Sequence, residues 1–300
     1  MCGIVGLFAK QTAVEDRLGD YISSMLIEMS DRGPDSAGVA VYRDPVPSGS
    51  AKVVLQHPDH GYDWQGLAEG ITARLAPATI ERRGNHAIAR TAAPFEDLRA
   101  WLRDTHPEVS VVSSGDTIEI FKEVGPPADV VSAFALRELK GTHALGHTRM
   151  ATESAVTTKG SHPFSTGFDL CLVHNGSLSN HNRLRAELRR HGVEIQTEND
   201  TEVAAGYLTW RLSEGDSLEE ALSEGIRDLD GFYTFAVGTR DGFAVLRDPI
   251  ACKHAVMAET DDWVAMATEF RAIAVLPGAD EARIWEPAPA QIYSWTRSGQ

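Results

Sequence analysis

The first residues of the chain, MCGIVGLF, place a cysteine directly after the initiator methionine. If Met1 is removed, Cys2 carries a thiol and a free α-amine on one residue, and the small Cys2 side chain permits that removal. A thiol has an ordinary pKa of about 8.5 and an α-amine one of about 7.7–8.0, so part of the amine is an available base near neutral pH. An N-terminal cysteine can therefore be a nucleophile with its own base. The alternative is that the cysteine stands here by chance.

Three later segments contain polar residues that could act on a substrate. Arg149, in HTRMAT, could hold a carboxylate in a bidentate fork, or it could form a surface ion pair. Asn175 and Gly176, in HNGS, could direct a side-chain amide and a backbone N–H at one oxygen, or they could form a tight turn. Asp200, in ENDTEV, could bind a substrate ammonium group or act as a helix cap.

Strands and helices must bring these residues together. The apolar pattern predicts a buried strand at IVGLFA, a helix from about 14 to 30 and a strand at VAVY, with the loop RGPDSAG before that strand. Strands are expected again around GHTR and LCLVH, followed by helices at 182–192, 199–212 and 217–229. The last helix opens with SLEE, a capping box. Short strands dominate the remaining residues, and this mixture indicates an α+β fold.

The segment from 44 to about 140 differs in character from the rest. It begins with the loop-forming run DPVPSGSA, ends near GPPAD, and contains an expected helix at PFEDLRAWLRDTH and an expected strand at TIEIFKEV. No strong linker flanks it. We therefore interpret residues 2–300 as a single domain with an elaborating insert at about 44–140.

Composition excludes several classes of protein. The net charge of −15 argues against binding to nucleic acid or to an anionic membrane surface. The chain has 3 cysteines and no CxxC pair, so neither a disulfide framework nor a cysteine zinc site is expected. Cys171 and Cys252 lie in apolar runs and are expected to be small core residues. The sequence shows no signal peptide and no long apolar stretch, which predicts a cytoplasmic protein.

Two pairs of histidines have spacings that could suit a metal. His57 and His60 are one pair, and His143 and His147 are the other. Neither pair has an evident third ligand nearby in the sequence, so no metal site is expected.

Five segments in order resemble a known family: CGIVG at the start, then RGPDSAG, GHTRMAT, HNGSLSN and NDTEV. Together they resemble the glutamine-hydrolysing domain of the class II glutamine amidotransferases, which are N-terminal-nucleophile hydrolases. The resemblance covers most of the chain apart from 44–140. It implies a four-layer αββα sandwich, in which two antiparallel sheets lie between helical layers.

The resemblance implies a reaction. Cys2 would be the nucleophile that attacks the γ-amide of glutamine, with its own amine as base. Asn175 and Gly176 would form the oxyanion hole. Ammonia would leave, and water would then release glutamate from a γ-glutamyl thioester.

The resemblance also implies how the substrate is held. Arg149, helped by Thr152, would bind the α-carboxylate of glutamine, and Asp200 would bind its α-ammonium group. Arg32, in RGPDSAG, and His162, in SHPF, would support the pocket without acting in the chemistry.

The consumer of the ammonia is expected on another polypeptide. In the family the glutaminase domain is usually fused to a synthase domain, and this sequence shows no such domain, no P-loop and no Rossmann fingerprint. From LRDPIACKHAV onward it looks most like free-standing glutaminase subunits of glutamate-synthase-like systems, namely N-methylglutamate synthase and GlxB-type proteins. That likeness implies a hetero-oligomer whose partner subunit carries FMN and an iron–sulfur cluster, with no cofactor in this chain. The alternatives are a stand-alone γ-glutamyl amidase and a non-catalytic glutamine-sensing subunit.

Overall fold

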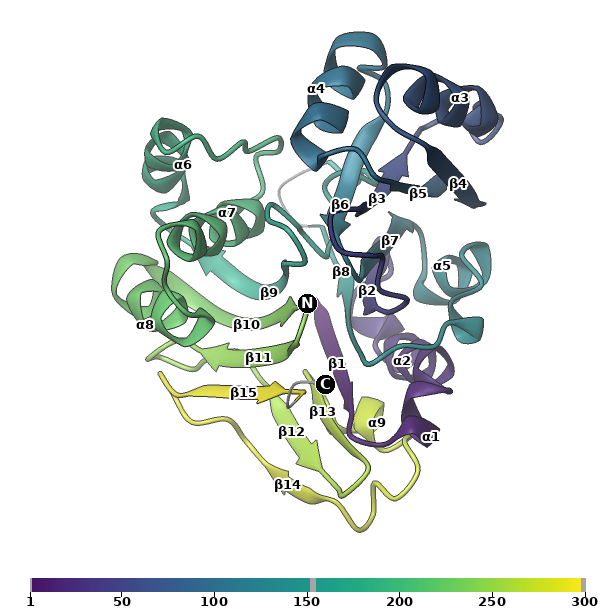
Figure 1. Ribbon diagram of the computed structural model, residues 1–300. Helices are drawn as coiled ribbons and strands as arrows, with labels where there is room; N and C mark the ends of the chain where they lie inside the picture. Colours follow the sequence, from purple (N-terminus) through teal and green to yellow (C-terminus); the bar gives the residue numbers. More distant parts are fainter. Residues whose placement is uncertain (1, 152–154, 298–300) are drawn as a thin grey trace.

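The computed structural model describes residues 2–151 and 155–297. Its framework is two antiparallel sheets packed face to face (Figure 1). The first sheet has seven strands in the order β14–β12–β13–β1–β8–β2–β7. They are β1 (Gly3–Ala9), β2 (Ser36–Tyr42), β7 (Ile118–Val124), β8 (His143–Arg149), β12 (Val256–Glu259), β13 (Trp263–Ala267) and β14 (Arg283–Trp285).

The second sheet has four strands in the order β15–β11–β10–β9. Buried side chains of β9, β10 and β11 belong to the same hydrophobic cluster as those of β1, β2 and β8, so the main core lies between the two sheets. The four strands are β9 (Cys171–Leu178), β10 (Gly231–Thr239), β11 (Gly242–Arg247) and β15 (Ile292–Thr296).

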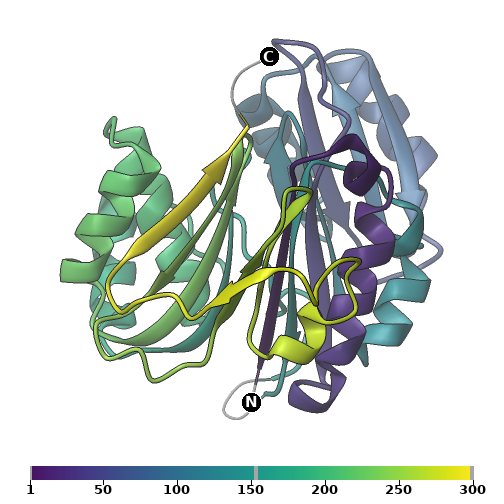
Figure 2. The same ribbon diagram turned by 90° about the horizontal axis from the view of Figure 1, so that it is seen from below.

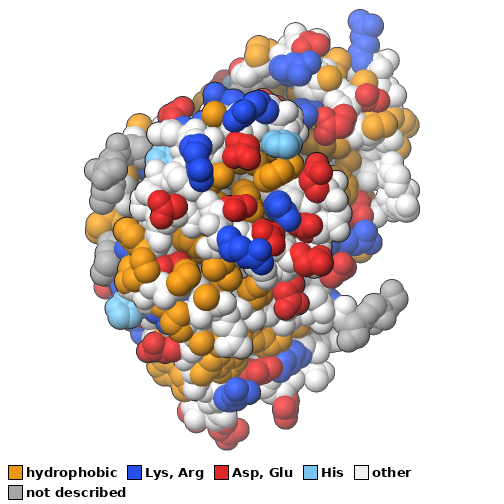
Figure 3. All heavy atoms as spheres, turned by 90° about the vertical axis from the view of Figure 1, so that its left-hand side faces the viewer, with side chains coloured by type: hydrophobic (Ala, Val, Ile, Leu, Met, Phe, Trp, Pro, Cys, Tyr) orange, Lys and Arg blue, Asp and Glu red, His pale blue; other side chains and the backbone are white. Residues whose placement is uncertain are grey.

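Helices cover the outer face of each sheet, which gives four layers (Figure 2). On the seven-stranded sheet lie α1 (Thr12–Glu15), α2 (Leu18–Glu28), α5 (Pro127–Ala133) and α9 (Phe270–Ile273), with short 3₁₀ turns at Ser30–Arg32 and Leu136–Glu138. On the four-stranded sheet lie α6 (His181–Arg190), α7 (Asp200–Ser213) and α8 (Leu218–Asp228). This is the predicted αββα sandwich, and on the side of α6–α8 acidic and basic side chains are interspersed (Figure 3).

The helix expected at 14–30 is divided into α1 and α2. The apolar face predicted for it is nevertheless buried, including Leu18, Ile22 and Met25. The break arises because the backbone there pairs with residues 139–141: Gly19 donates to the carbonyl of Leu139, and the carbonyl of Glu15 accepts from residue 141. The capping box expected at the start of α8 is confirmed.

Residues 51–115 build a third, four-stranded sheet in the order β4–β5–β3–β6, with its own hydrophobic cluster. Its elements are β3 (Ala51–Gln56), α3 (Trp64–Arg74), β4 (Ala78–Arg83), β5 (His86–Thr91), α4 (Phe95–Thr105) and β6 (Ser110–Gly115). The strand expected at TIEIFKEV is β7, which pairs with β2 in the main sheet. Residues 44–140 thus contribute strand β7 and helix α5, with the 3₁₀ turn after it, to the framework, and they also form one separate sheet.

Of the two cysteines expected in the core, Cys171 is buried and Cys252 is exposed. The prediction for Cys252 was wrong because the apolar run around it does not form a strand. It lies in the connection between β11 and β12, where its side chain has no sheet to pack against.

Candidate active site

Cys2 lies immediately before β1, at a point where the two sheets approach each other (Figure 1). Its backbone carbonyl accepts hydrogen bonds from Arg32 Nε at 3.0 Å and from Asn175 Nδ2 at 3.2 Å. The thiol is half-buried, and its sulfur lies 3.9 Å from the carbonyl oxygen of Met150. The backbone of Cys2 is therefore anchored from β9 and from the 3₁₀ turn before β2, while its thiol faces the segment that follows β8.

Gly3, the next residue, allows the chain to lie close to its neighbouring elements. Gly3 pairs with Thr148 in β8. A Cβ at Gly3 would lie 2.8 Å from Met29 Cβ and 2.9 Å from Thr148 Oγ1, closer than side chains tolerate. Glycine at this position therefore lets β1 lie close to β8 and to the end of α2 beside the cysteine.

Two residues that the sequence interpretation did not single out complete the anchorage. Thr268 Oγ1 accepts from the backbone N–H of Ile4 at 2.8 Å and from Asn175 Nδ2 at 3.1 Å. Glu269 forms an ion pair with Arg32. The signal that could have identified them is their position directly after β13, because β13 pairs with β1.

Arg149 is the last residue of β8 and is buried. Its Nη1 donates to the carbonyl of Gly160 at 3.2 Å. Asp35 holds the chain beyond it, since its carboxylate accepts from the N–H of Ala151 at 2.8 Å. The loop around 160 thus holds the buried guanidinium of Arg149 through at least one hydrogen bond. Thr152 lies outside the described residues.

Asn175 and Gly176 lie inside β9 and not in a turn, because the strand continues to Leu178. The alternative of a tight turn is therefore wrong. Gly176 has a φ of +147° and its Cβ, if present, would lie 2.0 Å from the carbonyl oxygen of Phe232. Only glycine fits this backbone, and it gives the strand its shape next to the Asn175 amide.

Asp200 is the first residue of α7, and its neighbour Asn199 is the actual cap, accepting from the N–H of Thr201. The capping alternative for Asp200 is therefore wrong. One carboxylate oxygen accepts from the N–H of Leu178 at 2.9 Å, and the other lies 3.8 Å from His174 Nδ1. About a quarter of the side chain, 23%, remains exposed. The carboxylate is thus held against β9, two to three residues from the Asn-Gly pair, with one side open.

His162 belongs to a buried cluster behind these residues. Its ring stacks on that of His147, with centroids 3.9 Å apart. Its Nε2 lies 2.8 Å from Thr201 Oγ1, and His174 Nδ1 lies 3.0 Å from the same hydroxyl. The cluster therefore joins β8, β9 and α7. Burial lowers the pKa of His147 to about 3 and that of His162 well below its ordinary value, so both rings are neutral.

This burial predicts acid sensitivity. Several buried histidines are neutral in the fold but take up a proton near pH 6.5 when unfolded, so their stabilising contribution is present above pH 6.5 and is lost as pH falls. We expect the free energy of unfolding to drop between pH 6.5 and 5 by up to about 1.4 kcal/mol per pH unit for each such histidine. The residues whose pKa burial lowers are His86, His143, His147, His162 and His174.

Urea unfolding at pH 7, 6 and 5 measures this slope, above the range in which ordinary carboxylates titrate. His143→Gln should reduce the slope of the free energy of unfolding against pH by the contribution of one histidine. His143 suits this test because it is buried between Tyr42 and Thr239 and outside the site. The exposed His60, replaced by glutamine, is the matched control and should leave the slope unchanged. A stability that is constant from pH 7 to 5 would contradict the prediction.

Within residues 2–151 and 155–297 the structure shows no group of three or more metal-ligating side chains. Over the same residues, none of the helices combines the length and the apolar character needed to span a bilayer.

Residues 147–275, which contain the part of the site from His147 onward, match a family model described as a glutamine amidotransferase domain. The chain is also 54% identical to the glutamine amidotransferase-like protein GlxB of Rhizobium meliloti, over 98% of this chain and 98% of GlxB. The chain belongs to the class II glutamine amidotransferases. The amidotransferase is therefore an enzyme of the N-terminal-nucleophile type.

Other relatives agree with this assignment. A protein of Methanothermobacter thermautotrophicus is 32% identical to the amidotransferase over 98% of this chain and 99% of its own. The glutamine–fructose-6-phosphate aminotransferase of Shewanella oneidensis is 31% identical over 44% of this chain, which is 22% of that enzyme. The solved glutamine phosphoribosylpyrophosphate amidotransferase of B. subtilis superposes with a TM-score of 0.62 at 20% identity, covering 98% of this chain and 47% of that one. This last likeness confirms the fold.

Proposed function

We propose that the amidotransferase hydrolyses the γ-amide of glutamine with Cys2 as nucleophile, after removal of Met1. The observation that carries the proposal is the convergence on Cys2. Its carbonyl is held by Arg32 and Asn175, and its thiol faces the residue that follows Arg149. A nucleophile, an amide donor and a buried cation thus meet at one point of the fold.

In the proposed first step the free α-amine of Cys2 takes the thiol proton, and the sulfur attacks the γ-carbon of glutamine. The negative charge that develops on the amide oxygen is stabilised by the N–H of Gly176 and by Asn175 Nδ2, which exchanges its hydrogen bond to the Cys2 carbonyl for one to this oxygen. The α-ammonium then returns the proton to the leaving nitrogen, and ammonia departs as the C–N bond breaks. A γ-glutamyl thioester remains, and water activated by the same amine hydrolyses it to glutamate.

Selectivity for glutamine follows from two charges. Arg149, with Thr152, binds the α-carboxylate, and the exposed part of Asp200 binds the α-ammonium group. An amide that lacks either group would lose the charge pairing with Arg149 or with Asp200, which costs binding energy. Arg32 and His162 serve as supports: the first holds the Cys2 backbone and the second packs beneath β8 and α7.

We further propose that the ammonia is passed to a separate synthase-type subunit that carries FMN and an iron–sulfur cluster. This proposal is supported by the match to GlxB along 98% of GlxB's own length, and by the resemblance of the C-terminal segment to free-standing glutaminase subunits. The acceptor chemistry would belong to a partner in a glutamate-synthase-like or N-methylglutamate synthase complex.

Two measurements test these proposals separately. An electrophilic glutamine analogue, 6-diazo-5-oxo-L-norleucine, should label Met1-free protein once, at Cys2, as located by peptide mass spectrometry. No labelling, or labelling at Cys252, would contradict the nucleophile. Native purification through a C-terminal tag should yield a yellow complex with a synthase-type chain. A colourless, partner-free protein that hydrolyses glutamine would instead indicate a stand-alone amidase, and one that binds glutamine without hydrolysis would indicate a sensor.

A further inference from the structure

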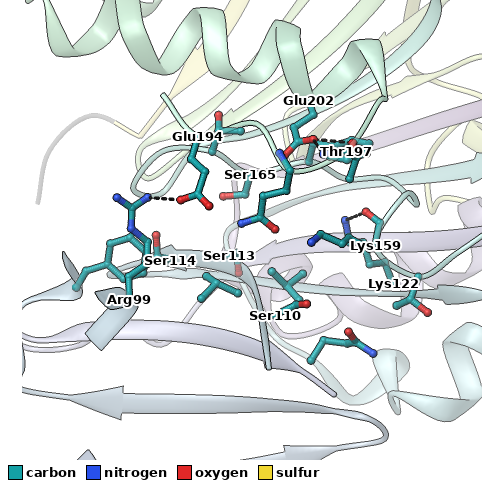
Figure 4. A pocket seen from close by; sticks show the side chains of 18 residues that line it. Arg99, Ser110, Ser113, Ser114, Lys122, Lys159, Ser165, Glu194, Thr197 and Glu202 are labelled. Carbon is teal, nitrogen blue, oxygen red and sulfur yellow. Dashed lines mark hydrogen bonds and ion pairs between the residues drawn. The ribbon is translucent and has the colours of Figure 1, made fainter. Parts of the chain in front are cut away.

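A second pocket lies between the separate sheet of residues 51–115 and the main framework (Figure 4). From the separate sheet it is lined by β3, α4 and β6. From the framework it is lined by β7, the segment 158–166 and the chain from 194 into α7. Its lining does not include Cys2, Arg149, Asn175 or Asp200, so it is distinct from the candidate active site.

Most charged groups that line this pocket are already satisfied by the protein. The Glu202 carboxylate accepts from the N–H groups of Gln196 and Thr197, at 2.8 and 2.6 Å, and from the Thr197 hydroxyl. Lys122 Nζ donates to the carbonyls of Ser161 and Pro163, at 2.7 and 3.1 Å. These two charged groups therefore bind other parts of the protein and form part of the pocket wall.

A buried hydroxyl in the lining has no hydrogen-bond partner among the described residues. Ser113 is only 2% exposed, and its hydroxyl is buried without a partner. A buried hydroxyl without a hydrogen-bond partner destabilises the fold, and a bound ligand can supply that partner. The lining also offers the hydroxyls of Ser110 and Ser114, the side-chain amides of Gln56 and Gln196, and the ammonium group of the exposed Lys159.

We propose that this pocket binds a small organic acid: one carboxylate on a short carbon chain that carries hydroxyl or carbonyl groups. Lys159 would pair with the carboxylate at the mouth. The serine hydroxyls and the two glutamine amides would bond the ligand's oxygens. Phe95, Phe164 and the valines of β6 line the same space and would contact its carbon atoms. Arg99 at the rim is already paired with Glu96 at 2.8 Å and with Glu194 at 3.5 Å, which leaves Lys159 as the cation open to an anionic ligand.

The segment that carries Lys159 also supports the candidate active site. Gly160 accepts from Arg149, and His162 stacks on His147. Lys122 holds this segment through the carbonyls of residues 161 and 163. A ligand bound to Lys159 would restrict the same segment, so we expect it to change the KM for glutamine by about fivefold or more.

Calorimetric titration of the full chain with matched pairs of small molecules tests the site. The acids are gluconate, glycerate and 2-oxobutyrate, and the corresponding neutral molecules are sorbitol, glycerol and 2-butanone. At least one acid should bind, and its neutral counterpart should bind at least ten times more weakly. Lys159→Gln should weaken the acid about tenfold and Ser113→Ala about threefold. Lys140→Gln, which removes a surface ammonium outside this pocket, is the control and should change nothing.

If none of the three acids binds, the proposed organic-acid site is wrong. It is also wrong if an acid binds the Lys159→Gln variant and the wild type equally well. Binding without any change in the KM for glutamine would overturn the coupling to Arg149. Because binding is measured without turnover, these failures are distinguishable from a failure of the glutaminase proposal, on which only the KM readout depends.

Discussion

Replacing Cys2 by alanine is expected to lower the rate of glutamine hydrolysis by roughly 10⁴-fold or more, because the variant has no group that can form the thioester. Alanine is also small enough for Met1 to be removed, so the comparison isolates the thiol. Initial-rate measurement of released glutamate, with the N-terminus verified by mass spectrometry, gives the result. Cys252→Ala is the matched control, since that cysteine is exposed and is not among the residues that hold the Cys2 backbone.

A second variant tests the role of the α-amine. A non-cleavable extension before Cys2 keeps the thiol but places the nitrogen in a peptide bond, where it cannot act as a base. We expect this variant to be nearly as inactive as Cys2→Ala while its melting temperature stays close to that of the wild type. Full activity in the extended protein would show that the base is another group.

Replacing Asn175 by alanine is expected to lower kcat by about 10²–10³-fold, the usual effect of losing one oxyanion donor. The KM should change little, because the donor acts on charge that develops in the transition state. A variant with normal kcat and raised KM would contradict this role and assign the amide to ground-state binding.

Thr268→Ala provides the control for Asn175. Its hydroxyl accepts from the Asn175 amide and from the N–H of Ile4, so its loss leaves the donor in place but less well oriented. We expect a smaller loss of kcat than in Asn175→Ala, and the double variant should lose less than the product of the two effects. Strict multiplication would show that Thr268 acts independently of Asn175.

Some features of the fold can be predicted from the sequence because they depend only on short segments. A buried strand directly after Cys2, a helical apolar face around Ile22 and a capping box at Ser217 are properties of short segments, and each was predicted correctly. The ordered set of segments around Arg149, Asn175 and Asp200 was enough to indicate the family, and through it the αββα fold.

Other features depend on contacts between distant segments. Thr268 and Glu269 meet Asn175 and Arg32 only because β13 pairs with β1, and Cys252 is exposed only because its apolar run lies between strands. No local pattern contains that information.

The sequence by itself was enough to propose the nucleophile and the polar residues that hold glutamine, and to predict the order of most framework elements, because residue type and short-range periodicity carry this information. Only the tertiary structure decided that Asn175 donates to the carbonyl of Cys2 and that two histidines contact the Thr201 hydroxyl while a third stacks on one of them. It also decided that residues 51–115 form a sheet whose side encloses a second pocket. The physical reason is that strand pairing brings together residues far apart in the chain, and the register of that pairing is selected by the whole buried core.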